Sequence, residues 1–90
     1  MKFSFRAKGR VQGVGYRVFV LRQAHSLALA GWVRNELDGA VSGAAGGDPE
    51  QLASFRAALR KGPPNASLEA LDWEALDEGQ SLPFPFEIRS

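Results

Sequence analysis

The chain has 90 residues, no cysteine and one histidine, and 44% of its residues are hydrophobic. This composition excludes disulfide bonds and thiolate metal sites, and it excludes a chain that is disordered for want of apolar residues. The net charge is only +1, but residues 1–36 carry seven basic side chains and one acidic one, so this part either faces an anionic partner or is simply a solvated basic face.

The N-terminal part of the chain predicts a strand, a glycine-rich turn and a helix. Residues 2–8 alternate apolar and polar side chains, which is the pattern of a half-buried strand. Residues 9–15 include three glycines and predict a turn. From Tyr16 to Leu27 the apolar side chains recur at helical spacing, so a helix follows the turn directly.

A hairpin and a second helix are predicted in the middle of the chain. Residues 31–35 and 39–46 form the two strands of the hairpin, and the Leu-Asp-Gly-Ala sequence at 37–40 indicates a tight turn because glycine tolerates a positive φ. The Asp-Pro-Glu-Gln sequence at 48–51 predicts a helix start with an aspartate N-cap, a proline at the first helical position and a capping box. The Gly-Pro pair at 62–63 ends this helix.

The C-terminal part predicts two more strands. Residues 68–75 form the first, and their alternation changes phase at residues 70–71, which indicates a bulge. Residues 84–88 alternate as a final strand, and the prolines at 83 and 85 confine that strand to the edge of a sheet.

In chain order these elements predict a ferredoxin-like β-α-β-β-α-β sandwich of the α/β (α+β) class. We expect an antiparallel sheet with two helices on one face and a short extra edge strand, formed by residues 1–90 as one domain. No apolar run approaches the about 20 residues of a membrane helix. The alternating N-terminus is also unlike a signal peptide, so we expect a cytoplasmic protein without a membrane partner.

The glycine-rich turn is the segment in which chemistry is expected. Its sequence, Gly-Arg-Val-Gln-Gly-Val-Gly-Tyr-Arg at residues 9–17, joins a strand to a helix N-terminus, where the first backbone amides lack helical partners. The glycines let these amides converge into a nest that binds phosphate, and Arg17 can add a bidentate contact. The spacing matches neither a dinucleotide fingerprint nor a Walker loop. A plain strand–helix turn with solvent-facing arginines remains the alternative.

Asn35 is the second candidate, because it ends a predicted strand beside the hairpin turn. Strand alternation places Val33 and Asn35 on one face and Trp32 and Arg34 on the other. If Val33 packs under the first helix, Asn35 points to the same side as Arg17. The alternative is that Asn35 only hydrogen-bonds its own turn.

Two segments resemble the signatures of a known family. The turn at residues 9–17 and the Gly-Trp-Val-Arg-Asn-Glu-Leu-Asp-Gly-Ala-Val sequence at 31–41 are similar to the two signatures of the acylphosphatase family, and the separation between them also fits. With the element order, the resemblance covers nearly the whole chain. It implies an enzyme that hydrolyses the carboxyl–phosphate bond of small acyl phosphates by direct attack of an oriented water. It also implies that inorganic phosphate is product and inhibitor, and that no metal or cofactor is required.

The family's site roles carry over to the matching positions. The resemblance implies that Arg17 and Asn35 are catalytic, Arg17 by binding the phosphate and Asn35 by positioning the water. Phosphoryl transfer asks mainly for positioning and charge stabilisation, which a nest, an arginine and an amide can supply. Ala28 stands where the family commonly has glycine, at a position resembling the left-handed end of a helix. The backbone amides implied to bind phosphate are those of Gln12, Gly13, Val14, Gly15, Tyr16 and Arg17.

A non-catalytic ferredoxin-like module that binds RNA or a small anionic ligand is the rival interpretation. RNA-binding sheets stack bases on aromatic side chains, and Phe3 and Phe5 are the candidates here. The sequence lacks the aromatic-rich motif of such domains, however. We therefore expect no nucleic-acid partner. We also expect a monomer that acts on a small molecule.

Overall fold

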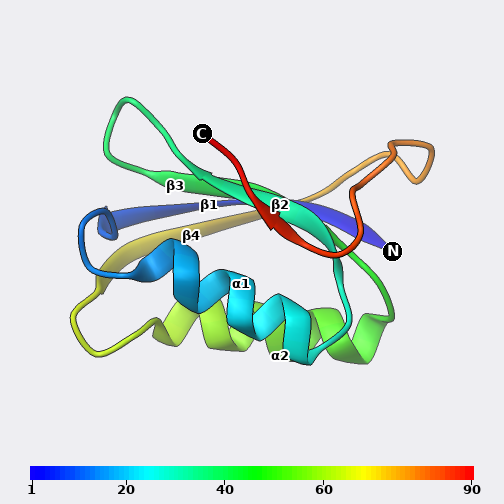
Figure 1. The fold of residues 1–90 in the computed structure, drawn as a ribbon, viewed down its shortest axis with the longest axis horizontal. Helices are drawn as coiled ribbons and strands as arrows, with labels where there is room; N and C mark the ends of the chain where they lie inside the picture. Colours follow the sequence, from blue (N-terminus) through cyan, green and yellow to red (C-terminus); the bar gives the residue numbers. More distant parts are fainter.

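The computed structural model describes residues 1–90 as two layers, with two helices lying on one face of a five-stranded sheet (Figure 1). The strand order is β4-β1-β3-β2-β5, and all neighbours are antiparallel except β5, which runs parallel to β2. The ferredoxin-like expectation is confirmed, although the edge strand β5 makes the sheet mixed. The elements are β1 (Lys2–Arg10), α1 (Tyr16–Ser26), β2 (Ala30–Asn35), β3 (Val41–Gly46), α2 (Pro49–Lys61), β4 (Ser67–Ala75) and β5 (Glu87–Ile88).

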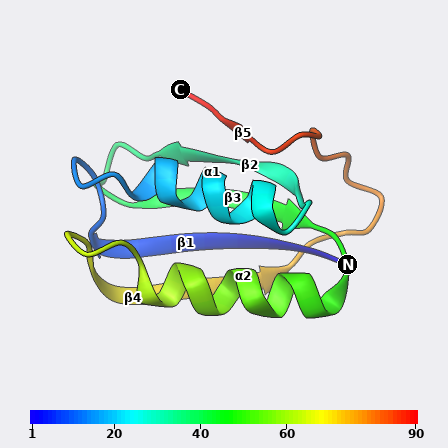
Figure 2. The ribbon, with the colours of Figure 1, turned by 60° about the horizontal axis from the view of Figure 1, so that its bottom comes forward.

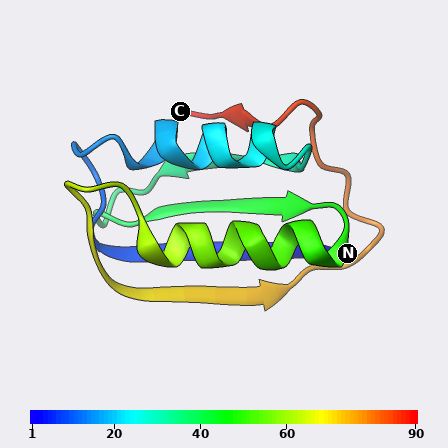
Figure 3. The ribbon, with the colours of Figure 1, turned by 90° about the horizontal axis from the view of Figure 1, so that it is seen from below.

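The core fills the space between the sheet and the helices. α1 covers β2 and β3, and α2 covers β1 and β4 (Figures 2 and 3). Each helix supplies one apolar stripe, because its buried residues recur at three- and four-residue spacing. These stripes are Tyr16, Val20 and Ala24 on α1, and Leu52, Phe55 and Leu59 on α2.

The small residues of β3 are required by its place in the sheet. All six of its residues are buried, between β1 and β2. A Cβ added at Gly43 would overlap the Trp32 carbonyl oxygen and the Phe5 ring. The poor intrinsic strand propensity of this segment is therefore offset by packing on both sides, as is usual for strand propensity.

α1 ends at Ser26, one residue before the predicted helix end at Leu27, and a left-handed turn centred on Ala28 follows it. Ala28 has φ +54°. Its N–H donates to His25 O at 3.1 Å, and Leu29 N–H donates to Ala24 O at 3.0 Å. These two bonds form a Schellman motif, in which the central residue is usually glycine. The expectation of a left-handed residue at position 28 is confirmed.

α2 begins and ends where the sequence predicts, but the predicted capping box does not form. Asp48 is the N-cap and its carbonyl accepts the first helical hydrogen bond, from Leu52 at 2.9 Å. The Asp48 side chain makes no cap hydrogen bond. The Asp48 side chain is exposed to solvent, which can solvate its carboxylate in place of the helix amides. Gly62, with φ +70°, ends the helix.

Two C-terminal expectations are also corrected. The bulge lies at Glu69, where the β1–β4 register skips one residue, and not at residues 70–71. The final strand is limited to β5, and of the three alternating residues Phe84, Phe86 and Ile88 only Phe86 is buried in the core. The Phe84–Pro85 peptide is cis. Neither α1 nor α2 has the length and apolar character of a helix that crosses a membrane.

The direction of the strands decides where a site can form. β1 and β2 run the same way, and α1 returns between them. The loop after β1, the start of α1 and the β2–β3 hairpin therefore lie together at one end of the sheet (Figure 3).

Candidate active site

The loop between β1 and α1 is shaped by two left-handed glycines. Gly13 has φ +74° and Gly15 has φ +80°, and Gly15 is the N-cap of α1. A Cβ at either position would meet no atom within 4 Å, so glycine is needed for the backbone conformation and not for space. Val11, which is buried, anchors the loop to the core.

The backbone N–H groups of residues 12–18 donate to no acceptor within the chain. The first hydrogen bond of the helix runs from Phe19 N–H to Gly15 O at 3.0 Å. The loop therefore presents a continuous run of free donors at the positive end of the α1 dipole. Such a run is an anion-binding arrangement.

Arg17 stands in the first turn of α1, and its side chain forms no ion pair with any other residue. Arg6 pairs with Asp38 and Arg34 with Glu36, whereas Arg10, at the start of the loop, is unpaired like Arg17. Arg17 is thus a free guanidinium beside the free amides, and a guanidinium can bind an oxyanion with two parallel hydrogen bonds.

Two side chains of the loop are structural. Tyr16 is 1% exposed and its hydroxyl donates to Leu59 O at 2.8 Å. Burial raises the pKa of the Tyr16 phenol. Val14 packs against the core. Of the groups expected to bind phosphate, Val14 and Tyr16 therefore have only backbone amides to offer.

Gln12 has a role that sequence reasoning missed. Its Nε2 donates to Glu36 O at 2.8 Å and to Ala40 O at 2.9 Å, across the β2–β3 hairpin. The side chain thus ties the loop to the hairpin that follows Asn35. No pattern within a single segment signals this contact, because the donor and its acceptors are 24 and 28 residues apart.

Asn35 ends β2 opposite Val41, and its Oδ1 is buried without a hydrogen-bond partner. The alternative that Asn35 bonds its own turn is wrong. The hairpin is closed instead by Ala40 N–H to Asp38 Oδ1 at 3.0 Å and by Glu36 N–H to Ala40 O at 2.8 Å. A buried acceptor without a partner costs free energy, so it marks a position where a donor is expected.

The acids near this end of the sheet are held as anions by their own partners. Hydrogen bonds from Arg34 and Ser42 lower the pKa of Glu36. The Ala40 N–H and Arg6 lower the pKa of Asp38. A lowered pKa makes each of these carboxylates a weaker base than an ordinary one.

The structure offers no histidine and no metal-ligating cluster at this end of the sheet. The one histidine, His25, is exposed near the far end of α1 and its Nε2 lies 2.8 Å from Phe86 O. No three His, Cys, Asp or Glu side chains gather into a group that could hold a metal ion.

The fold and this loop define a class of protein: a ferredoxin-like α/β domain with a loop of unpartnered backbone amides between its first strand and first helix. A family model described as Acylphosphatase matches residues 3–88. The chain belongs to the acylphosphatase family, whose members are hydrolases that act on acyl phosphates.

Individual relatives agree with this assignment. The acylphosphatase of Salinibacter ruber is 46% identical over 81 residues, which cover 90% of this chain and 85% of the relative. That of Synechococcus sp. is 46% identical over 71 residues, which cover 79% of this chain but only 61% of the relative. The crystal structure of acylphosphatase from Bacillus subtilis superimposes with a TM-score of 0.83 at 35% identity, covering 99% of this chain and 98% of that one.

Proposed function

We propose that this chain hydrolyses the carboxyl–phosphate bond of small acyl phosphates at the loop that precedes α1. The observation that carries the proposal is the run of unpartnered N–H groups at residues 12–18, with the unpaired Arg17 beside it. A dianionic phosphoryl group satisfies these donors and the guanidinium together.

Binding also supplies most of the catalysis. In a loose phosphoryl-transfer transition state, charge is spread over the three non-bridging oxygens of the phosphoryl group. Backbone amides that already point at these oxygens stabilise that charge without reorganising. Arg17 adds a full positive charge at the same place. The leaving group is a carboxylate, which is stable as an anion and requires no general acid.

Asn35 orients the attacking water. Its buried Oδ1 accepts a hydrogen bond from the water, which is directed at phosphorus opposite the leaving carboxylate. The water oxygen forms a bond to phosphorus as the bridging P–O bond breaks with its electron pair. A carboxylate, inorganic phosphate and one proton are released. An amide fixes the position of the water but does not remove its proton, and the neighbouring acids Glu36 and Asp38 are committed to their own partners.

Inorganic phosphate is both product and inhibitor in this scheme, since it fits the same donors. We also propose that the protein acts as a cytoplasmic monomer and needs no metal or nucleic acid. The rival RNA-binding interpretation depends on Phe3 and Phe5 lying on an open sheet face. Phe5 is buried in the core, and Phe3 stacks on Trp73 under α2.

Hydrolysis of benzoyl phosphate in excess chelator is the direct test. We expect turnover that inorganic phosphate inhibits competitively. Phosphate binding without turnover would indicate the non-catalytic anion-binding module instead. A rate that collapses in chelator and returns with magnesium or zinc would contradict the proposed mechanism.

A further inference from the structure

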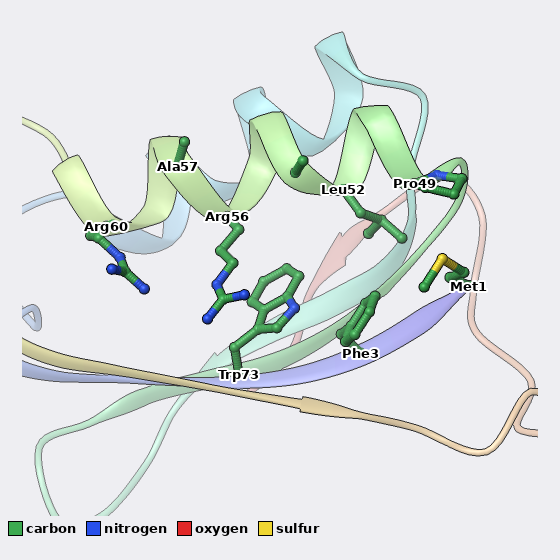
Figure 4. Close-up of a pocket in the computed structure, with 9 residues that line it drawn as sticks. Met1, Phe3, Pro49, Leu52, Arg56, Ala57, Arg60 and Trp73 are labelled. Atoms are coloured by element: carbon green, nitrogen blue, oxygen red, sulfur yellow. The ribbon is translucent and has the colours of Figure 1, made fainter.

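A groove runs along the outer side of α2, between this helix and strands β1 and β4 (Figure 4). Its volume is about 530 Å³, which lies within the range of small-molecule pockets, about 300–1,000 Å³. The proposed active site does not include it, since none of its lining residues belongs to the loop after β1 or to the β2–β3 hairpin.

The floor of the groove is aromatic and apolar. Phe3 and Trp73 stack with their ring centroids 5.1 Å apart, and both are only half-buried. Leu52 closes the floor from the helix side. Figure 4 shows Phe3 and Trp73 rising from the sheet toward α2. Partly exposed aromatic side chains of this kind favour an apolar ligand body.

The rim of the groove is cationic. Arg56 and Arg60 lie one turn apart on α2 and both line the groove. Arg56 lies over the Trp73 ring, 5.5 Å from its centroid. Neither arginine forms an ion pair. Glu69 lines an adjoining hollow together with Arg60 but forms no ion pair with it.

We propose that this groove binds an amphiphilic carboxylate. The apolar tail of the ligand lies on the aromatic floor, and its carboxylate pairs with Arg56 and Arg60. A planar carboxylate matches the planar guanidinium fork, and two adjacent arginines complement one negative head group. Removing the tail from water supplies the remaining affinity.

Octanoate is a suitable probe because it does not absorb where tryptophan does. The Trp32→Phe variant leaves Trp73 as the single tryptophan, since the chain has two. We expect saturable octanoate binding that changes Trp73 fluorescence. We expect octanoate to bind about tenfold more tightly than octanol, which has the same tail without the charge, and octylammonium to bind more weakly still. Saturating inorganic phosphate should leave the octanoate affinity unchanged.

Charge variants test the rim. Arg56→Gln with Arg60→Gln should remove the preference for octanoate over octanol, while Arg22→Gln should keep it. Arg22 is a matched control because it is exposed and unpaired on the other helix. Ala57→Glu, which adds a negative charge in the groove, should weaken octanoate and favour octylammonium.

Three results would overturn the proposal. The first is equal affinity for octanoate and octanol. The second is loss of octanoate binding when phosphate is added, which would assign the anion to the loop before α1. The third is a Trp73 signal that responds to protein concentration and not to octanoate, which would show that a second copy of the chain covers the groove.

Discussion

Replacing Ala28 by glycine should raise the melting temperature of this protein without changing its activity. Ala28 has φ +54° at the C-terminal end of α1 and is exposed, so the substitution relieves backbone strain and removes no buried contact. An alanine in this left-handed conformation costs about 1–2 kcal/mol. Glycine also makes the unfolded chain more flexible, which lowers the free energy of unfolding by about 0.4–1 kcal/mol.

From the midpoints of these two ranges, the net gain is about 0.8 kcal/mol in the free energy of unfolding. For a domain of this size, that corresponds to a rise of about 3–6 °C in the melting temperature. Thermal unfolding followed by circular dichroism measures it directly. The matched control is Ala53→Gly, an exposed alanine in the middle of α2, where glycine should cost about 1 kcal/mol. If Ala28→Gly lowers the melting temperature as Ala53→Gly does, residue 28 behaves as ordinary helix in solution and the reasoning fails.

The remaining predictions concern the site. Arg17→Ala should lower kcat/KM at least about a hundredfold. Arg17→Lys should restore little of this activity, because a point charge lacks the bidentate contact of a guanidinium. Wild-type turnover in a folded Arg17→Ala protein would refute the proposed role of Arg17. Asn35→Ala should lower kcat severely while phosphate inhibits with a similar constant, and Asn35→Asp should also fail because a second anion repels phosphate. An Asn35→Ala enzyme with normal kcat and weaker phosphate inhibition would make Asn35 a binding residue. Gln12→Ala should lower the free energy of unfolding by about 1–3 kcal/mol, because the loop loses its hydrogen bonds to the hairpin. For the same reason it should lower kcat and weaken phosphate inhibition together. An effect on stability alone would make Gln12 merely structural.

Features that depend on neighbouring residues were predictable from the sequence. The period of the apolar residues located α1 to within one residue at its C-terminal end, and the Asp-Gly pair located the β2–β3 turn. The loop after β1 was predictable for the same reason, since its glycines and the following helix are contiguous. The roles of Arg17 and Asn35 were inferred from a family resemblance and stay predictions.

Features that join distant residues were not predictable. The Gln12 contact to the hairpin depends on the pairing of β1 with β3, which brings the β2–β3 hairpin beside the loop after β1 and which no local pattern encodes. The parallel pairing of β5 with β2 depends on the path of the chain after β4, and the bulge at Glu69 depends on the register with β1. The unpartnered Oδ1 of Asn35 is likewise visible only when its whole environment is known.

The hydrogen bond from the Tyr16 hydroxyl to the Leu59 carbonyl links the start of α1, beside the loop after β1, to the last turn of α2. Local opening of that turn breaks the bond and releases the residue on which α1 begins. A ligand that binds only the closed loop therefore makes this opening rarer, even though the opening occurs in another helix. We therefore expect inorganic phosphate bound at the start of α1 to slow amide hydrogen exchange at the end of α2. Occupancy of the loop should thus stabilise the end of a helix that contributes no group to the proposed chemistry.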